Sequence, residues 1–123
     1  MAERRKRGRL SRSGDFDRVF RDGRSQGNRF LVAYSFPRSE PGAEGARLGI
    51  SVSRKVGGAA DRNTIKRALR EAFWSLEAEL PPDHDFVLVA RPDSRGLVER
   101  EGTAGLTAAL RELIRPDSGR KAA

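Results

Sequence analysis

The side chains that support covalent or metal chemistry are scarce in this chain of 123 residues. It contains no cysteine, which excludes disulfides, thiolate metal sites and a cysteine nucleophile. His84 is its only histidine, so we expect neither a histidine-based metal cluster nor a Ser-His-Asp triad. The residue types therefore predict a protein with no catalytic residues and no metal site of its own.

The carboxylates that could still hold a metal do not converge. Asp83 and Asp85 flank His84, but neighbouring side chains on an extended segment point to opposite sides. Asp15 and Asp17 are two residues apart on an expected helix, a spacing that places them on different faces. An autonomous metal-dependent nuclease needs converging carboxylates, so this alternative is disfavoured.

The dominant chemical signal in the sequence is basic. There are 25 Lys+Arg residues against 17 Asp+Glu, a formal net charge of +8, and 21 of the basic residues are arginine. Arginine presents a planar fork of donors that matches phosphate oxygens and stacks on bases. Residues 1–12 and 54–70 each carry a net charge of +5, so the rest of the chain is slightly acidic. This pattern predicts a nucleic-acid partner, with no membrane and no small-molecule substrate.

The second basic segment contains two rows of polar side chains on an expected helix. Arg62, Lys66 and Arg70 repeat every four residues, and Asn63 and Arg67 form a second row beside them. Cations near a helix N-terminus oppose the helix dipole, so a purely structural helix would carry carboxylates there. The rows therefore predict contact with the phosphate backbone of RNA or DNA. The alternative is an ordinary solvated helix face.

These residues need a scaffold, and the hydrophobic periodicity predicts an α+β domain. Phe16, Val19 and Phe20 recur at helical spacing after Ser13, a suitable N-cap, and Gly23 ends the pattern. We expect one sheet of at least three strands with helices packed mainly on one side. The expected order is helix 13–23, strand 30–36, hairpin-type loop 37–46, strand 47–53, helix 62–80, strand 84–91, loop 92–103 and a helix from about 106 that Pro116 ends.

The second strand and the long helix each show which face they bury. Leu48, Ile50 and Val52 alternate with small residues, so one face of this strand is expected to join the core. The opposite face, which includes Gly49 and Ser51, is expected to form a shallow floor. The apolar positions of the long helix form a single stripe of Ile65, Leu69, Ala72, Phe73, Leu76 and Leu80.

The chain length fits one small domain, expected at residues 13–116, between a flexible basic N-terminal arm (1–12) and a flexible C-terminal tail (117–123). No apolar run approaches the length of a membrane span, and no apolar stretch follows the basic N-terminus as it would in a signal peptide. We therefore expect a cytoplasmic protein. Apolar residues make up 37% of the chain, so the expected core is small and depends partly on a partner.

Residues 51–73 resemble the signature of the bacterial ribonuclease P protein subunit. That signature has a glycine-rich approach, here Gly57 and Gly58, then a core that begins here with Arg62 and Asn63, and finally Lys-Arg with an arginine one turn later. The resemblance covers about residues 8–115 in the expected order and spacing. Its other parts are Arg9-Leu10, Asp15-Phe16, Val19-Phe20, Gly23, Asn28-Arg29 and Val89-Ala90-Arg91-Pro92.

Three positions depart from the family pattern. Thr64 stands where the Arg-Asn-Arg core usually has its second arginine, and Gly58 stands where asparagine is common. Asp61 adds an acid beside the motif. These changes remove one cation and one amide, which weakens the case for an RNA contact at Thr64.

The resemblance implies a fold and a function. The fold is a small single-domain α/β sandwich, ribosomal-protein S5 domain 2-like, with a left-handed βαβ crossover against the usual right-handed rule. The function is that of the protein subunit of ribonuclease P, whose partners are the catalytic RNA and precursor tRNA. In this family the RNA removes the 5′ leader with bound Mg²⁺, and the protein holds the leader in a cleft. A ribosomal or ribosome-assembly protein, which would lack such a cleft, is the alternative.

The same resemblance assigns the site residues to two groups. The contacts with the catalytic RNA are Arg54, Lys55, Arg62, Asn63, Lys66, Arg67 and Arg70. The cleft for the leader is lined by Arg12, Phe16, Phe20, Tyr34, Ser51 and Arg91. Rings in such a cleft can stack on unpaired bases. For the two phenylalanines the alternative is core anchoring of the first helix, and Trp74 is either an RNA contact or partly buried.

Overall fold

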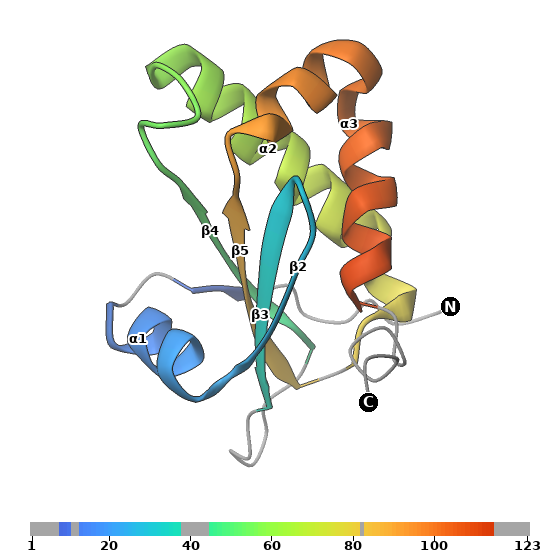
Figure 1. The fold of residues 1–123 in the computed structure, drawn as a ribbon. Coiled ribbons are helices and arrows are strands. Elements are labelled where there is room, and N and C mark those ends of the chain that lie inside the picture. The colour runs from blue at the N-terminus through green and yellow to red at the C-terminus, as the bar shows by residue number, and fades with distance from the viewer. Residues whose placement is uncertain (1–7, 11–12, 38–44, 82, 115–123) are drawn as a thin grey trace.

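A single mixed sheet forms the centre of the computed structural model, which describes residues 8–10, 13–37, 45–81 and 83–114 (Figure 1). The elements are β1 (Gly8–Arg9), α1 (Ser13–Asp22), β2 (Arg24–Gly27), β3 (Leu31–Pro37), β4 (Arg47–Val52), α2 (Ala59–Ser75), the 3₁₀ turn η1 (Glu77–Glu79), β5 (His84–Ala90) and α3 (Asp93–Ile114). The strand order is β1-β4-β5-β3-β2. The central strand β5 pairs in parallel with β4 and antiparallel with β3.

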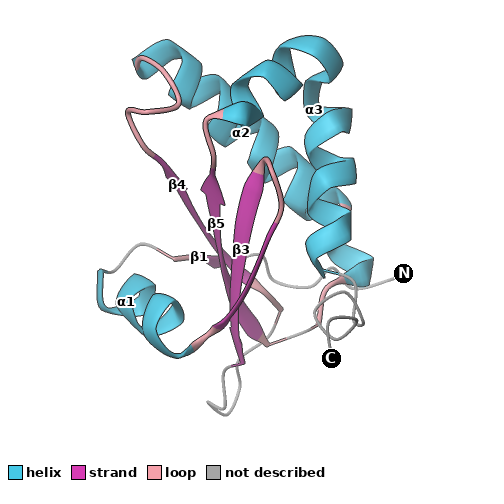
Figure 2. Ribbon diagram, viewed as in Figure 1, coloured by secondary structure: helices cyan, strands magenta, loops and turns pink. Residues whose placement is uncertain are grey.

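Side chains alternate between the two faces of the sheet, and each face has its own core. Phe86 and Leu88 of β5 join the larger core beneath α2 and α3, whereas Val87 packs with Val19 of α1 on the opposite face. Figure 2 shows α2 and α3 side by side, with α1 well away from them. The structure therefore confirms an α+β fold with helices mainly on one side. All six apolar positions expected in the stripe of the long helix are buried.

Two strands of the sheet have no apolar pattern that predicts them. β2 reads Arg-Ser-Gln-Gly and forms because it pairs along its whole length with β3. β1 has two residues, which pair in parallel with Arg47 and Leu48 at the start of β4. The hairpin predicted between strands 30–36 and 47–53 is wrong, because β5 lies between β3 and β4. The hairpin of this sheet is β2–β3, and Asn28 Oδ1 closes it by accepting hydrogen bonds from two backbone N–H groups.

Two helix boundaries also differ from prediction. The helix α2 begins at Ala59, and the chain tightens into η1 after Ser75, so the expected helix 62–80 is one α-helix and a 3₁₀ turn. The loop predicted at 92–103 is wrong, since this segment is the first part of α3. Its residue Leu97 is buried, so tertiary packing overrides the turn signals. The kink falls at Gly102, whose φ of 67° suits glycine.

The long helix α2 connects two parallel neighbours, β4 and β5, so these three elements form a βαβ unit. This connectivity agrees with the crossover that the family resemblance implies, and its left hand stays a prediction. The unit matters for function because it fixes α2 against the β4 side of the sheet.

A buried ion pair joins β4 to β5. Asp85 is fully buried and accepts hydrogen bonds from Arg47, at 2.8 Å from Nε and 2.7 Å from Nη2. The two residues are direct partners in the register of the parallel strands. Arg47 also lies 3.8 Å from a carboxylate oxygen of Asp15 in α1, so one guanidinium links three elements. Two of the carboxylates considered for a metal site thus have structural partners.

Candidate nucleic-acid interface

The helix α2 presents the two predicted rows beside its buried face. Ile65, Leu69 and Phe73 are buried beneath it. Of the rows themselves, Asn63, Arg67 and Arg70 are exposed, and Arg62 and Lys66 are half-buried. A rigid helix therefore holds these side chains at a fixed spacing, which suits the regular repeat of a phosphate backbone.

The cations of these rows form no ion pair with a carboxylate of the described residues. Arginines elsewhere in the same range are paired, and the pairs include Arg18–Asp15, Arg29–Asp93, Arg47–Asp85, Arg95–Asp61 and Arg111–Glu79. The acidic residues thus neutralise the body of the protein and leave the rows on α2 charged. An unneutralised row of this kind attracts a polyanion.

Two of the three departures from the family signature, Thr64 and Asp61, have a structural explanation, and nothing in the structure requires the glycine at position 58. The hydroxyl of Thr64 donates a hydrogen bond to the backbone oxygen of Ala60, 3.0 Å away, so this side chain turns back onto its own helix. Asp61 pairs with Arg95 of α3 at 3.3 Å. Gly58 caps α2 with extended backbone and no side-chain hydrogen bond. The acid beside the motif therefore joins two helices and does not neutralise the rows.

Arg54 and Lys55 lie in the turn that leads from β4 to α2, and both are exposed. The turn is held by a hydrogen bond from the Val56 N–H to the Ser53 oxygen, at 3.1 Å. Val56 itself is buried and anchors the turn to the core. These two cations extend the basic surface beyond the N-terminus of α2.

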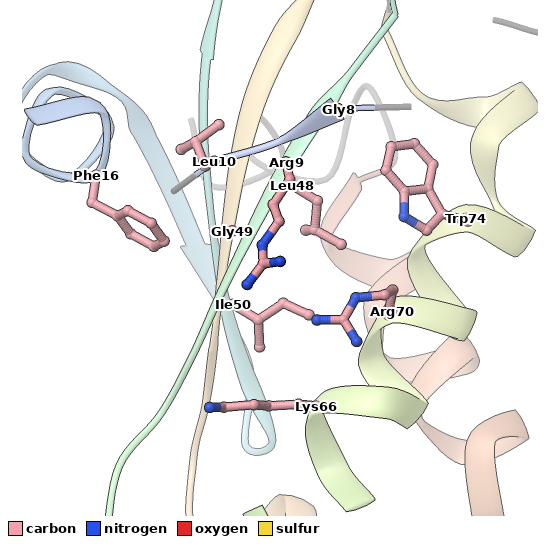
Figure 3. Close-up of a pocket in the computed structure, with 10 residues that line it drawn as sticks. All are labelled: Gly8, Arg9, Leu10, Phe16, Leu48, Gly49, Ile50, Lys66, Arg70 and Trp74. Atoms are coloured by element: carbon pink, nitrogen blue, oxygen red, sulfur yellow. The ribbon is translucent and has the colours of Figure 1, made fainter. Parts of the chain in front are cut away.

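A hollow of about 440 Å³ lies between the edge of β4 and α2, and we call it the edge hollow. Figure 3 shows the side chains of Arg9, Lys66 and Arg70 pointing into the space beside Ile50, with Trp74 next to Arg70. Phe16 closes the hollow from the α1 side. Three cations from two elements therefore surround one concave site, and none of the described residues that line it is acidic.

The opposite face of the sheet carries the aromatic residues predicted for the leader cleft. The rings of Phe16 and Phe20 lie 6.3 Å apart, and the Tyr34 ring meets Phe20 edge-on at 4.9 Å. Phe20 is 41% exposed, so it does not anchor α1; the fully buried Val19 does. The structure therefore brings these three rings together in one row, and Phe20 presents the most accessible ring surface of the three.

The small residues of β4 have two different roles. A Cβ on Gly49 would lie 2.5 Å from Cζ of Phe16, so glycine is needed for the ring to pack there. Ser51, two residues along, is half-buried and pairs with Val89 of β5. The floor predicted for a strand of nucleic acid is thus partly filled by Phe16, and its remaining part begins at Ser51.

The two arginines predicted for the cleft lie away from this aromatic row or outside the described residues. Arg91 is exposed just after β5, where its backbone N–H donates a hydrogen bond to the backbone oxygen of Phe30 at 2.9 Å. Arg91 follows Val87, the strand partner of Tyr34, by four residues. Along an extended strand this separation is roughly 13 Å. Arg12 lies outside the described residues. The structure therefore groups the rings with one another, and Arg91 lies farther along the sheet.

The sequence places Arg9 in the N-terminal arm and gives no sign of its position in the edge hollow. Arg9 reaches that site because β1 pairs in parallel with β4, through bonds such as Leu10 N–H to the Leu48 oxygen at 3.0 Å. Two residues with no apolar alternation give no strand signal, so no sequence pattern could have placed it.

In the part of the chain that the structure describes, no three histidine, aspartate or glutamate side chains are grouped so that they could hold a metal ion. Within the same residues, no helix is long and apolar enough to cross a membrane.

The fold and these surfaces define a small α+β protein whose long helix presents a row of cations that have no ion-pair partner among the described residues. Comparison with known proteins makes this specific, because residues 5–115 match the family model described as Ribonuclease P. Relatives named ribonuclease P protein component are 42% identical over 102 residues in Shouchella clausii (83% of this chain and 82% of the relative) and 40% over 87 residues in Listeria innocua (71% of each).

Solved structures agree with this match. The ribonuclease P protein of Staphylococcus aureus has a TM-score of 0.73 and 34% identity, and the match covers 84% of this chain and 92% of that one. The ribonuclease P protein of Thermotoga maritima has a TM-score of 0.76 and 32% identity, and the match covers 87% of this chain and 94% of that one. The chain belongs to the ribonuclease P protein family: it is the protein subunit of the tRNA-processing ribonucleoprotein, an endoribonuclease holoenzyme, and its partner is RNA.

Proposed function

We propose that α2 binds the catalytic RNA of ribonuclease P while the aromatic row beside α1 holds the 5′ leader of precursor tRNA. The observation that carries the proposal is the presence of two chemically different surfaces on one scaffold. The cations in the rows of α2 have no ion-pair partner among the described residues, which suits them to the phosphates of a structured RNA. The rings of Phe20 and Tyr34 suit the bases of a single strand.

In this proposal the protein binds and orients, and the RNA supplies the reaction centre. Mg²⁺ bound by the RNA would supply the activation of water needed to hydrolyse the phosphodiester at the start of the mature tRNA. Cleavage leaves a 5′-phosphate on the tRNA and releases the leader with a 3′-hydroxyl. Cations of the protein lower the repulsion between two polyanions, which stabilises the complex at low Mg²⁺. We place this reaction in the cytoplasm.

Reconstitution tests the proposal. The protein is mixed with a bacterial ribonuclease P RNA at low Mg²⁺, and the cleavage of precursor tRNA is followed with and without a 5′ leader on the substrate. We expect the protein to increase cleavage and substrate affinity, with the larger effect on the substrate that has a leader. An equal effect on both substrates would remove the leader cleft from the proposal and favour general RNA binding of the kind a ribosomal protein shows.

Two further outcomes of the same assay would contradict the proposal. If the protein gives no gain in cleavage of any substrate, the assignment of the catalytic RNA as its partner fails. If the protein cleaves precursor tRNA without the RNA, the reaction centre lies in the protein, and the proposal that the RNA supplies it is wrong.

A further inference from the structure

Trp74 is the only tryptophan of the chain, and the proposed contacts leave it without a role. It lies in the last turn of α2, one residue beyond the buried Phe73, and is half-buried. The two rings meet edge-on at 4.8 Å with planes at 82°, so the core fixes the orientation of the indole. Part of its surface lines the edge hollow (Figure 3).

We propose that the edge hollow binds one unpaired nucleotide of the catalytic RNA, with its base on Trp74 and its phosphate among Arg9, Lys66 and Arg70. This inference rests on the proposed function, because it assumes that α2 contacts the catalytic RNA. It adds a site for a single extruded nucleotide to a surface otherwise described as a row of phosphate contacts.

Charge supports the phosphate part of the site. Arg9 comes from β1, whereas Lys66 and Arg70 come from consecutive turns of α2, and all three side chains point into the same space (Figure 3). None of the three has an ion-pair partner among the described carboxylates. Three unneutralised cations around one concave site repel one another, and a phosphate relieves that repulsion.

The shape and apolar parts of the hollow support the base. Its volume of about 440 Å³ falls in the usual range of sites for molecules of nucleotide size. Leu48 and Ile50 form an apolar wall beside the cations, and Trp74 adds an aromatic surface. A base paired in a helix has both faces covered by its neighbours, so only an unpaired base can stack on this ring.

The test uses the emission of Trp74, which no other tryptophan can obscure. The protein is titrated with a bacterial ribonuclease P RNA that it activates in the reconstitution assay. We expect saturable quenching, and ultraviolet cross-linking should join the peptide that contains Trp74 to a nucleotide that is unpaired in the RNA. Trp74→Leu should weaken RNA binding about tenfold, because it removes a stacking partner. Trp74→Phe retains a ring and should stay within about threefold of the parent protein.

The controls separate this inference from the proposed function. Arg111→Ala removes a cation that pairs with Glu79 outside the hollow, and it should leave the quenching unchanged. If the parent protein stimulates cleavage but its emission does not change on RNA binding and Trp74→Leu binds normally, the nucleotide site is wrong and the proposed function stands. A cross-link to a base-paired nucleotide, or equal quenching by poly-glutamate, would also overturn the site. If the leucine variant fails to fold, quenching and cross-linking of the parent protein still test whether a nucleotide binds at Trp74.

Discussion

Arg47 and Arg70 show two different uses of the same side chain. Arg47 binds the buried Asp85 through two hydrogen bonds and lies close to Asp15, so its charge is neutralised inside the fold. Arg70 lies on α2 with no ion-pair partner among the described residues, and its charge faces the edge hollow. Pairing, which sequence composition does not show, therefore separates the structural arginines from those available to RNA.

The first prediction concerns the buried pair. Arg47→Ala should lower the free energy of unfolding by about 3 kcal/mol, because it leaves the carboxylate of Asp85 buried without its main partner. Urea denaturation followed by circular dichroism measures this change as a lower midpoint at an unchanged slope. The matched control is Arg111→Ala, which breaks an exposed pair with Glu79 and should cost less than about 1 kcal/mol. Equal losses for both variants would show that burial does not distinguish the two pairs.

At the scale of elements, the sequence predicts α2 and β5 well because their signals are local. The apolar stripe of α2 and the run from Phe86 to Val89 carry their own periodicity, so β5 forms where expected and α2 covers most of its predicted range. The position of the two rows along one side of α2 follows directly from that helix. The sequence alone is therefore enough to place these side chains, while their contacts with RNA stay a prediction.

Other elements depend on partners that are distant in sequence. Arg24–Gly27 becomes a strand only because β3 offers its edge, and Arg9 reaches the edge hollow only because β1 pairs with β4. Turn signals favour a loop in the first part of α3, yet burial of Leu97 against the core stabilises it as a helix. Gly49 belongs to the same class, since the reason for glycine is the ring of Phe16 from another element.

The second prediction concerns the rows on α2. Changing Arg62, Lys66 and Arg67 together to alanine should weaken binding to the catalytic RNA and reduce the slope of log K against log salt by about 2 to 3, since each phosphate contact contributes roughly one unit. Filter binding at several salt concentrations measures the slope. The control is the triple variant Arg29→Ala, Arg95→Ala, Arg111→Ala, which loses the same net charge from paired positions. If both variants change the slope equally, the rows act only through net charge.

At the scale of the whole molecule, the two proposed RNA surfaces meet at the edge of β4. α1 lies on one face of the sheet, and α2 packs on the other (Figure 2). Phe16 and Lys66 nevertheless line the same hollow from opposite sides of that strand. A protein of this size can therefore contact a large RNA along one helix while a second, single-stranded segment passes along the opposite face. Apart from Phe16, the two contacts depend on separate residues, so substitutions elsewhere should separate them.

The third prediction tests that separation. Phe20→Ala combined with Tyr34→Ala should lower the affinity of the reconstituted holoenzyme for leader-bearing precursor tRNA about tenfold or more, because each ring that stacks on a base contributes about 1–3 kcal/mol. Binding of the catalytic RNA to the protein, and its salt slope, should stay as in the parent protein. Phe20 is 41% exposed, so its removal costs little stability. Tyr34→Phe retains the ring and serves as the matched control. If the double variant loses affinity equally for substrates with and without a leader, the aromatic row acts on the holoenzyme as a whole and does not bind the leader.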